Sequence, residues 1–134
     1  MIDQKSKDML VDHARQARAW AYAPYSKYAV GAALLASSGR IYEGVNIENA
    51  VYPLGICAER VAIFKSVSEG EMQFLAIAVV TEDGGTPCGS CRQVLSEFGL
   101  DTVVIIADSS GNISIETTVG DLLPKAFSLE SRKK

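Results

Sequence analysis

The positions of three cysteines constrain the fold of this chain more than any other feature of the sequence. Cys57 opens a Cys-Ala-Glu-Arg stretch, and Cys88 and Cys91 lie in a Pro-Cys-Gly-Ser-Cys-Arg stretch. A helix-sized and a strand-sized segment separate the two stretches, and each stretch falls where a loop meets a predicted helix. A fold that aims both helix N-termini at one point would collect three thiolates, which the positive ends of the helix dipoles favour.

Three thiolates at one point form a good zinc site with a free position. They would bind Zn²⁺ at about 2.3 Å each and leave the fourth tetrahedral position to water. Zinc lowers the pKa of such a water toward about 7 and so provides hydroxide at neutral pH. Glu59, two residues after Cys57, could point into the same cleft and carry the proton to a substrate. An exposed helical glutamate is the alternative interpretation of Glu59.

Three thiolates also donate much negative charge to the metal, and a nearby cation should offset it. Arg60 and Arg92 each follow a motif element directly and are the candidates. A solvated arginine on the first turn of a helix is the alternative for both, and it is less expected for Arg60 than for Arg92.

Other interpretations of the cysteines come from different classes of protein. A Cys-x-x-Cys at a helix start is typical of thioredoxin-like redox pairs, but it would leave Cys57 unexplained. A structural zinc site would need a fourth protein ligand, and the single histidine, His13, lies on the apolar face of a predicted helix, where we expect packing. Inert buried cysteines are a third possibility, although they do not typically gather at two helix starts.

The remaining pattern alternates helices with apolar strands. We expect helices over 6–23, ended by Pro24, and from about 57 to 70 and 88 to 99, with a helical turn at 119–123. We expect strands at 29–36, 40–45, 75–80, 103–107 and 112–117, the first two forming a hairpin. This order predicts a layered α/β fold with a mixed sheet, in one domain over residues 1–134 that ends in a short flexible tail.

Composition excludes several classes of partner. The net charge is −3 and the basic residues are scattered, so we expect no nucleic-acid partner. No segment approaches membrane-spanning length and the N-terminus lacks an apolar signal core, so we expect no membrane association and a cytoplasmic location. An odd number of cysteines in a reducing compartment argues against disulfides.

At these motifs the chain resembles the small zinc-dependent cytidine deaminases. The resemblance extends in matching order over residues 24–27, 30–33, 44–49, 92–94 and 122–124. It implies one Zn²⁺ per subunit bound by Cys57, Cys88 and Cys91, with Glu59 as the proton shuttle. Arg60 corresponds to an arginine that offsets the thiolate charge.

The resemblance also implies the residues that bind the substrate. Asn46 and Glu48 match a pair that hydrogen-bonds the ribose hydroxyls. Tyr28 stands where many members place a phenylalanine against the base, and Ala58 also matches a substrate-binding position. Tyr52 and Phe127 resemble positions that complete the pocket of a neighbouring subunit.

The implied fold is a three-layer αβα sandwich with a mixed five-stranded sheet, assembled as a homotetramer with shared active sites. The implied reaction is hydrolytic deamination of the small-molecule nucleosides cytidine and deoxycytidine to uridine and deoxyuridine plus ammonia, in pyrimidine salvage. Two alternatives stay open. One is deamination of another cytosine nucleoside such as an aminonucleoside antibiotic, which the Asn46 and Glu48 pair argues against. The other is a zinc-binding module without catalysis.

Overall fold

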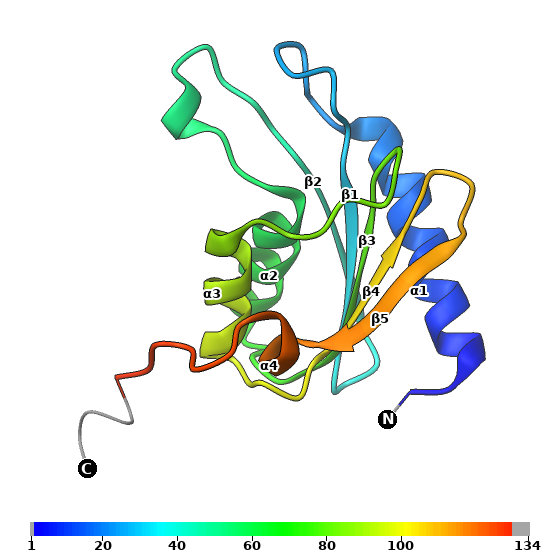
Figure 1. Cartoon of the computed structure of the whole chain (residues 1–134), viewed down its shortest axis with the longest axis vertical. Coiled ribbons are helices and arrows are strands. Elements are labelled where there is room, and N and C mark those ends of the chain that lie inside the picture. Colours follow the sequence, from blue (N-terminus) through cyan, green and yellow to red (C-terminus); the bar gives the residue numbers. More distant parts are fainter. Residues whose placement is uncertain (1, 130–134) are drawn as a thin grey trace.

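A mixed sheet forms the central layer of the protein (Figure 1). The computed structural model describes residues 2–129, and within them five strands pair in the order β2-β1-β3-β4-β5. The strands are β1 (Gly31–Ala36), β2 (Ile41–Val45), β3 (Phe74–Val80), β4 (Val103–Ala107) and β5 (Ile113–Thr118). Strands β3 and β4 run parallel, and the other neighbours are antiparallel. The predicted hairpin and mixed sheet are therefore confirmed.

Helices cover both faces of the sheet. They are α1 (Gln4–Ala17), α2 (Ala58–Ser68), α3 (Gly89–Glu97) and the single turn α4 (Val119–Leu122), with 3₁₀ turns at Arg18–Trp20 and Tyr52–Leu54. Figure 1 shows α1 on one side of the sheet and α2 and α3 on the other. The chain therefore has the predicted three layers.

Each face of the sheet has its own apolar core, because strand side chains alternate in direction. Ala32 and Leu34 of β1 pack with residues of α2 and α3, whereas Ala33 and Leu35 of the same strand pack with α1. Central strand β3 contributes to both cores, which explains why it consists entirely of apolar residues.

Two glycines let the helices approach the sheet closely. A Cβ at Gly31 would lie 2.1 Å from the carbonyl oxygen of Ala14 in α1. A Cβ at Gly44 would lie 2.3 Å from the carbonyl oxygen of Ala58 in α2. Both strand backbones are thus packed directly against helix backbone, and no larger residue fits without moving a helix.

The first helix ends earlier than predicted. The α-helix stops at Ala17, a 3₁₀ turn follows, and the backbone is extended from Ala21. The Tyr22 N–H donates to the Asn46 carbonyl and the Glu48 N–H donates to the Tyr22 carbonyl, so this segment pairs with the chain after β2. A distant partner, not Pro24, therefore ends the helix.

His13 does not pack into the core as predicted. Its ring Nδ1 lies 2.6 Å from Oε2 of Glu43 on β2, and its side chain is 40% exposed. It lies on α1, on the side of the sheet away from α2 and α3, so it is remote from the cysteines.

Two further predictions concern the C-terminal tail and membrane-spanning segments. Most of the predicted C-terminal tail lies outside the described residues. Among the helices of residues 2–129, none has the length and apolar character needed to cross a bilayer.

Candidate zinc-dependent active site

Two helix N-termini meet at the cysteine cluster. Cys57 is the N-cap of α2 and Cys88 is the N-cap of α3, while Cys91 lies in the first turn of α3. The Sγ atoms of Cys57 and Cys88 are 3.8 Å apart, and those of Cys88 and Cys91 are 3.3 Å apart. All three sulfurs lie within 4.8 Å of one another. The predicted convergence of the two helix starts is thus what the fold produces.

The geometry of these sulfurs fits zinc. Thiolates at about 2.3 Å from a tetrahedral ion lie about 3.8 Å from each other, close to the observed separations. Among residues 2–129 this group of candidate ligands contains three members, so a tetrahedral ion would keep one position for a non-protein ligand. Cys91 is buried and Cys88 is exposed toward the cavity described below, which places the open side of the cluster there.

Arg60 supplies positive charge to the thiolates. Its Nη2 lies 3.5 Å from Sγ of Cys57, and its buried Nε has no hydrogen-bond partner among residues 2–129. The pKa of Cys57 is lowered, first by a hydrogen bond from the Cys91 thiol and then by Arg60, against the opposing effect of burial. The pKa of Cys91 is raised by that same contact with Cys57 and by burial. Cys57 is therefore the thiolate that Arg60 stabilises.

Arg92, the other candidate cation, donates its hydrogen bonds to backbone carbonyls. Its Nε donates to the carbonyl of Pro87 at 2.9 Å, and its Nη1 donates to the carbonyl of Leu122 at 3.0 Å. These bonds fix the loop that enters Cys88 against the end of α4. Arg92 therefore has a structural role, and the alternative of a solvated arginine is wrong.

Glu59 is buried beside the cluster. It lies in the first turn of α2, its residue is 4% exposed, and its carboxyl group lines the same cavity as Cys57 and Cys88. Its pKa is raised, mainly because burial penalises the charged form and also because of the nearby Cys57 thiolate. A carboxyl group that holds its proton more readily than usual is suited to proton transfer. The alternative of an exposed helical glutamate is therefore wrong.

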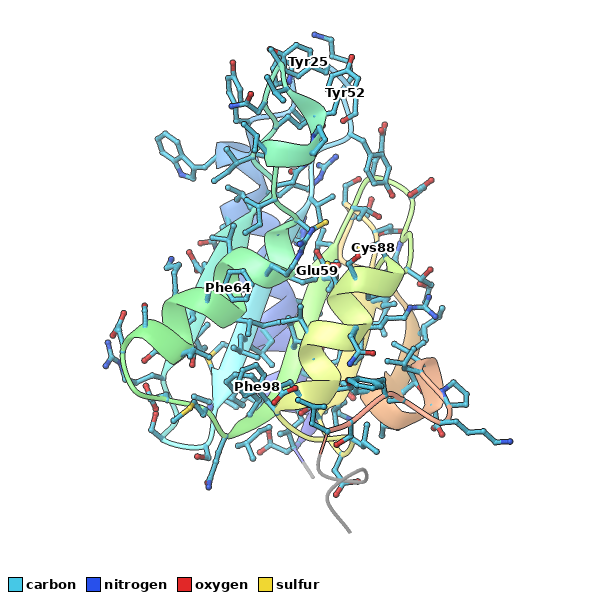
Figure 2. All side chains as sticks on the ribbon, turned by 90° about the vertical axis from the view of Figure 1, so that its left-hand side faces the viewer. Tyr25, Tyr52, Glu59, Phe64, Cys88 and Phe98 are labelled. Atoms are coloured by element: carbon cyan, nitrogen blue, oxygen red, sulfur yellow. The ribbon has the colours of Figure 1, made fainter. Side chains whose placement is uncertain are left out.

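A cavity of about 740 Å³ opens over Glu59 and the cysteines. That volume is within the usual range for small-molecule sites. Three segments form its walls, at residues 25–30, 46–60 and 79–88. Figure 2 shows Glu59 and Cys88 close together at the starts of their helices, with Tyr25 and Tyr52 beyond them at the far end. The predicted substrate residues that line it are Tyr28, Asn46, Glu48, Tyr52 and Ala58.

Asn46 and Glu48 hold one wall of this cavity in place. Oδ1 of Asn46 accepts from the Val30 N–H at 2.9 Å, and its Nδ2 donates to the Tyr28 carbonyl at 2.8 Å. Oε1 of Glu48 accepts from the backbone N–H groups of Tyr25 and Ser26, and its Oε2 accepts from the Ser26 hydroxyl. These bonds stabilise the turn that carries the chain into β1. Their predicted contact with ribose stays a prediction.

Sequence reasoning missed the partner of Tyr28. The Tyr28 hydroxyl donates to Oδ1 of Asp83 at 2.7 Å, and Asp83 lies in the loop between β3 and Cys88. The sequence showed this stretch as a loop of Glu, Asp and Gly, and no signal in it indicated which residue would contact Tyr28.

Tyr52 and Phe127 lie differently with respect to the cavity. The Tyr52 side chain is exposed on the cavity wall, with its ring centroid 5.9 Å from that of Tyr25. Phe127 lies outside the cavity lining, near α3, where its carbonyl accepts from Nε2 of Gln93 at 3.2 Å. Their predicted role in a neighbouring subunit's pocket stays a prediction.

The chain is similar to known proteins over the segments that form this site. Residues 4–107 match the family model described as the cytidine and deoxycytidylate deaminase zinc-binding region. A cytidine deaminase of Sporosarcina psychrophila is 51% identical over 126 residues, covering 92% of each chain. The crystal structure of cytidine deaminase from Burkholderia pseudomallei is 42% identical, covers 94% of this chain and all of its own, and superposes with a TM-score of 0.84. A blasticidin-S deaminase of Bacillus cereus is 31% identical over 112 residues, covering 76% of this chain and 79% of its own.

Proposed function

The chain belongs to the cytidine and deoxycytidylate deaminase family, and on this basis we propose that it deaminates cytidine and deoxycytidine. The reaction consumes water and yields uridine or deoxyuridine and ammonia. One observation carries the proposal: three thiols converge beside a buried glutamate, and two of them, Cys57 and Cys88, line one nucleoside-sized cavity together with Glu59. We infer that the reaction serves pyrimidine salvage.

Cys57, Cys88 and Cys91 would hold the zinc ion. Bound there, zinc supplies an activated water as the nucleophile for C4 of the cytosine ring. Arg60 offsets part of the thiolate charge through its contact with Cys57, which keeps the metal site electrophilic.

Glu59 moves the protons of the reaction. Its raised pKa favours a protonated carboxyl group that donates to N3 of the ring as the nucleophile adds to C4. The carboxylate so formed takes the proton of the hydroxyl group added at C4 and gives it to the amino group, so that a C=O bond forms as the C–N bond breaks and ammonia leaves. Burial beside the cluster keeps this exchange away from bulk water.

The remaining cavity residues would orient the nucleoside. Asn46 and Glu48 are assigned to the ribose hydroxyls, Tyr28 to the face of the base and Ala58 to contact beside it. All four line the cavity that contains Glu59, which supports this assignment.

Association between copies of the chain is part of the proposal. We infer a homotetramer in which Tyr52 and Phe127 complete the pocket of a neighbouring subunit. Large apolar side chains exposed in the single chain support it, with Trp20 at 83%, Tyr52 at 75% and Leu54 at 70%. Light scattering of purified protein tests the subunit number. Three reduced thiols as metal ligands fit a cytoplasmic location, which we also infer.

Two competing functions have their own supports. The similarity to a blasticidin-S deaminase supports a different cytosine nucleoside as substrate, although at lower identity than the similarity to cytidine deaminases. A zinc module without catalysis has the cysteine cluster as its support. Assays for ammonia release from cytidine, deoxycytidine and blasticidin S separate all three functions.

The decisive variant is Glu59→Gln, which keeps the size of the side chain and removes the proton-transferring group. We expect it to retain zinc and to lose about 10²- to 10⁴-fold in turnover of cytidine. Glu97→Gln, at an exposed position near the end of α3, is the matched control and should keep parental turnover. Turnover by Glu59→Gln within a few-fold of the parent protein would refute the assignment.

A further inference from the structure

Two walls of the cavity are joined by one side-chain hydrogen bond. The Tyr28 hydroxyl, on the wall of residues 25–30, donates to Oδ1 of Asp83, on the loop that leads from β3 to Cys88, at 2.7 Å. We propose that Tyr28 and Asp83 are positioning residues whose hydrogen bond ties the base-side wall of the pocket to the loop that carries Cys88 to the zinc site. This inference rests on the proposed function of the site.

The carboxylate of Asp83 is held from a second side by Thr81. Thr81 directly follows β3 and is 2% exposed. Its hydroxyl lies 3.3 Å from Oδ1 of Asp83 and accepts from the N–H groups of Gly84 and Gly85, both at 2.8 Å. The loop is therefore folded around one buried hydroxyl, and Asp83 presents its carboxylate to Tyr28 from a defined position.

The lack of a side chain at Gly85 leaves room for the Tyr28 hydroxyl. A Cβ at Gly85 would lie 2.5 Å from the Tyr28 oxygen, whereas its next neighbours, Cζ of Tyr28 and Oδ1 of Asp83, would both be at an ordinary 3.7 Å. Gly84, one residue earlier, has a positive φ of +80°, and Gly85 does not. An alanine at position 85 would therefore clash with the Tyr28 oxygen without straining its own backbone. The obstacle is the oxygen that distinguishes tyrosine from phenylalanine.

This arrangement gives the hydroxyl of Tyr28 a partner in the protein. The hydroxyl faces Asp83, which leaves the ring as the surface available to a substrate base. Burial raises the pKa of Tyr28, and the hydrogen bond from Tyr28 lowers the pKa of Asp83, so a neutral phenol and a charged carboxylate persist together near neutral pH.

The connection reaches the metal ligands through a short stretch of loop. Cys88 is the most exposed of the three cysteines and follows Asp83 by five residues. Arg92 anchors the far end of this loop through the Pro87 carbonyl, and Tyr28 anchors its start through Asp83. Loss of the start anchor should loosen both Cys88 and the base-side wall.

The first experiment measures zinc release from the zinc-loaded protein to a chelating dye, together with KM for cytidine. Tyr28→Phe and Asp83→Ala should each accelerate zinc release about five- to tenfold and raise KM by a similar factor, which lies within the range for the loss of one ordinary hydrogen bond. The double variant should match Asp83→Ala alone, because the bond that Tyr28→Phe removes is already absent there. Tyr22→Phe is the control, since Tyr22 is 54% exposed and does not line the cavity.

The second experiment uses the steric fit. Gly85→Ala should accelerate zinc release and lower the thermal midpoint, and adding Tyr28→Phe should restore both to the values of Tyr28→Phe alone. Parental zinc release in Tyr28→Phe and Asp83→Ala, additive effects in the double variant, or tolerance of Gly85→Ala beside Tyr28 would overturn the inference. Zinc release and the thermal midpoint need no turnover, so an inactive parent protein would refute the proposed function and leave these two readouts as the test of the inference.

Discussion

Gly44→Ala tests whether the close packing of α2 on the sheet sets the position of the active site. The new methyl group would lie 2.3 Å from the carbonyl oxygen of Ala58, 2.6 Å from the N of Ala62 and 3.1 Å from Cβ of Val61. All three atoms belong to α2, whose N-cap is Cys57 and whose first turn contains Glu59. The substitution therefore acts on the site through a backbone contact and touches no functional side chain.

The size of the effect follows from the distances. A carbon–oxygen contact relaxes at about 3.3 Å, so the start of α2 must move away from β2 by about 1 Å. Overpacking of this kind lowers the free energy of unfolding by about 1–3 kcal/mol. A 1 Å displacement of groups in an active site lowers turnover by about 100-fold. We expect kcat for cytidine to fall by about that factor, with faster loss of zinc to a chelator.

Gly31→Ala is the matched control. Its methyl group would lie 2.1 Å from the carbonyl oxygen of Ala14, an equally severe clash, but on the opposite face of the sheet against α1. The two variants should lose similar stability in urea unfolding, while Gly31→Ala in its folded form keeps zinc and kcat within a few-fold of the parent. Equal losses of kcat in both variants, or none in Gly44→Ala, would refute the reasoning.

Three further predictions address the metal site and the fold. Removal of zinc by a chelator should abolish deamination, and added Zn²⁺ should restore it; Cys88→Ser should not recover under the same treatment, as measured by metal content and ammonia release. Arg60→Gln should move the acidic limb of the kcat/KM profile to higher pH, because the thiolate charge of Cys57 is no longer offset, and Arg60→Lys should restore part of the shift. The hydrogen bond to Glu71 raises the pKa of Tyr42 from 10.0 to about 12, so its contribution to stability is present below pH 10 and is lost as the pH rises through 12. Urea midpoints between pH 8 and 12 should therefore fall more steeply in the parent protein than in Tyr42→Phe.

The sequence was sufficient for most elements of the fold because their signals are local. Apolar runs, helix periodicity and breaking residues lie within each segment, and the observed strands agree with the predicted ones to within about two residues. The end of α1 was missed because its cause is not local. Tyr22 bonds to the backbone of Asn46 and Glu48, and nothing within 6–23 indicates that pairing.

The residues of the candidate site also differ in whether their signals are local in the sequence. Cys57, Glu59 and Cys88 carry their chemistry in the residue type and spacing, so the sequence indicated both the metal and the acid. Arg92 and Asp83 act through geometry: each makes its key contact with a residue far along the chain, Leu122 and Tyr28 respectively. A charged residue in a loop or on a helix does not specify such a partner.

Asn46 and Glu48 were predicted as substrate residues from the sequence, but their bonds to the wall of residues 25–30 depend on the fold. Each is bonded to the wall of residues 25–30, yet one carbonyl lone pair and one N–H of Asn46 and further carboxylate lone pairs of Glu48 remain for a ligand. The wall that faces the base and the proposed contacts with ribose therefore depend on the same two side chains. Because removing either one unties the wall, Asn46→Ala should weaken binding of free cytosine as well as of cytidine, whereas a group that contacted ribose alone would affect cytidine only.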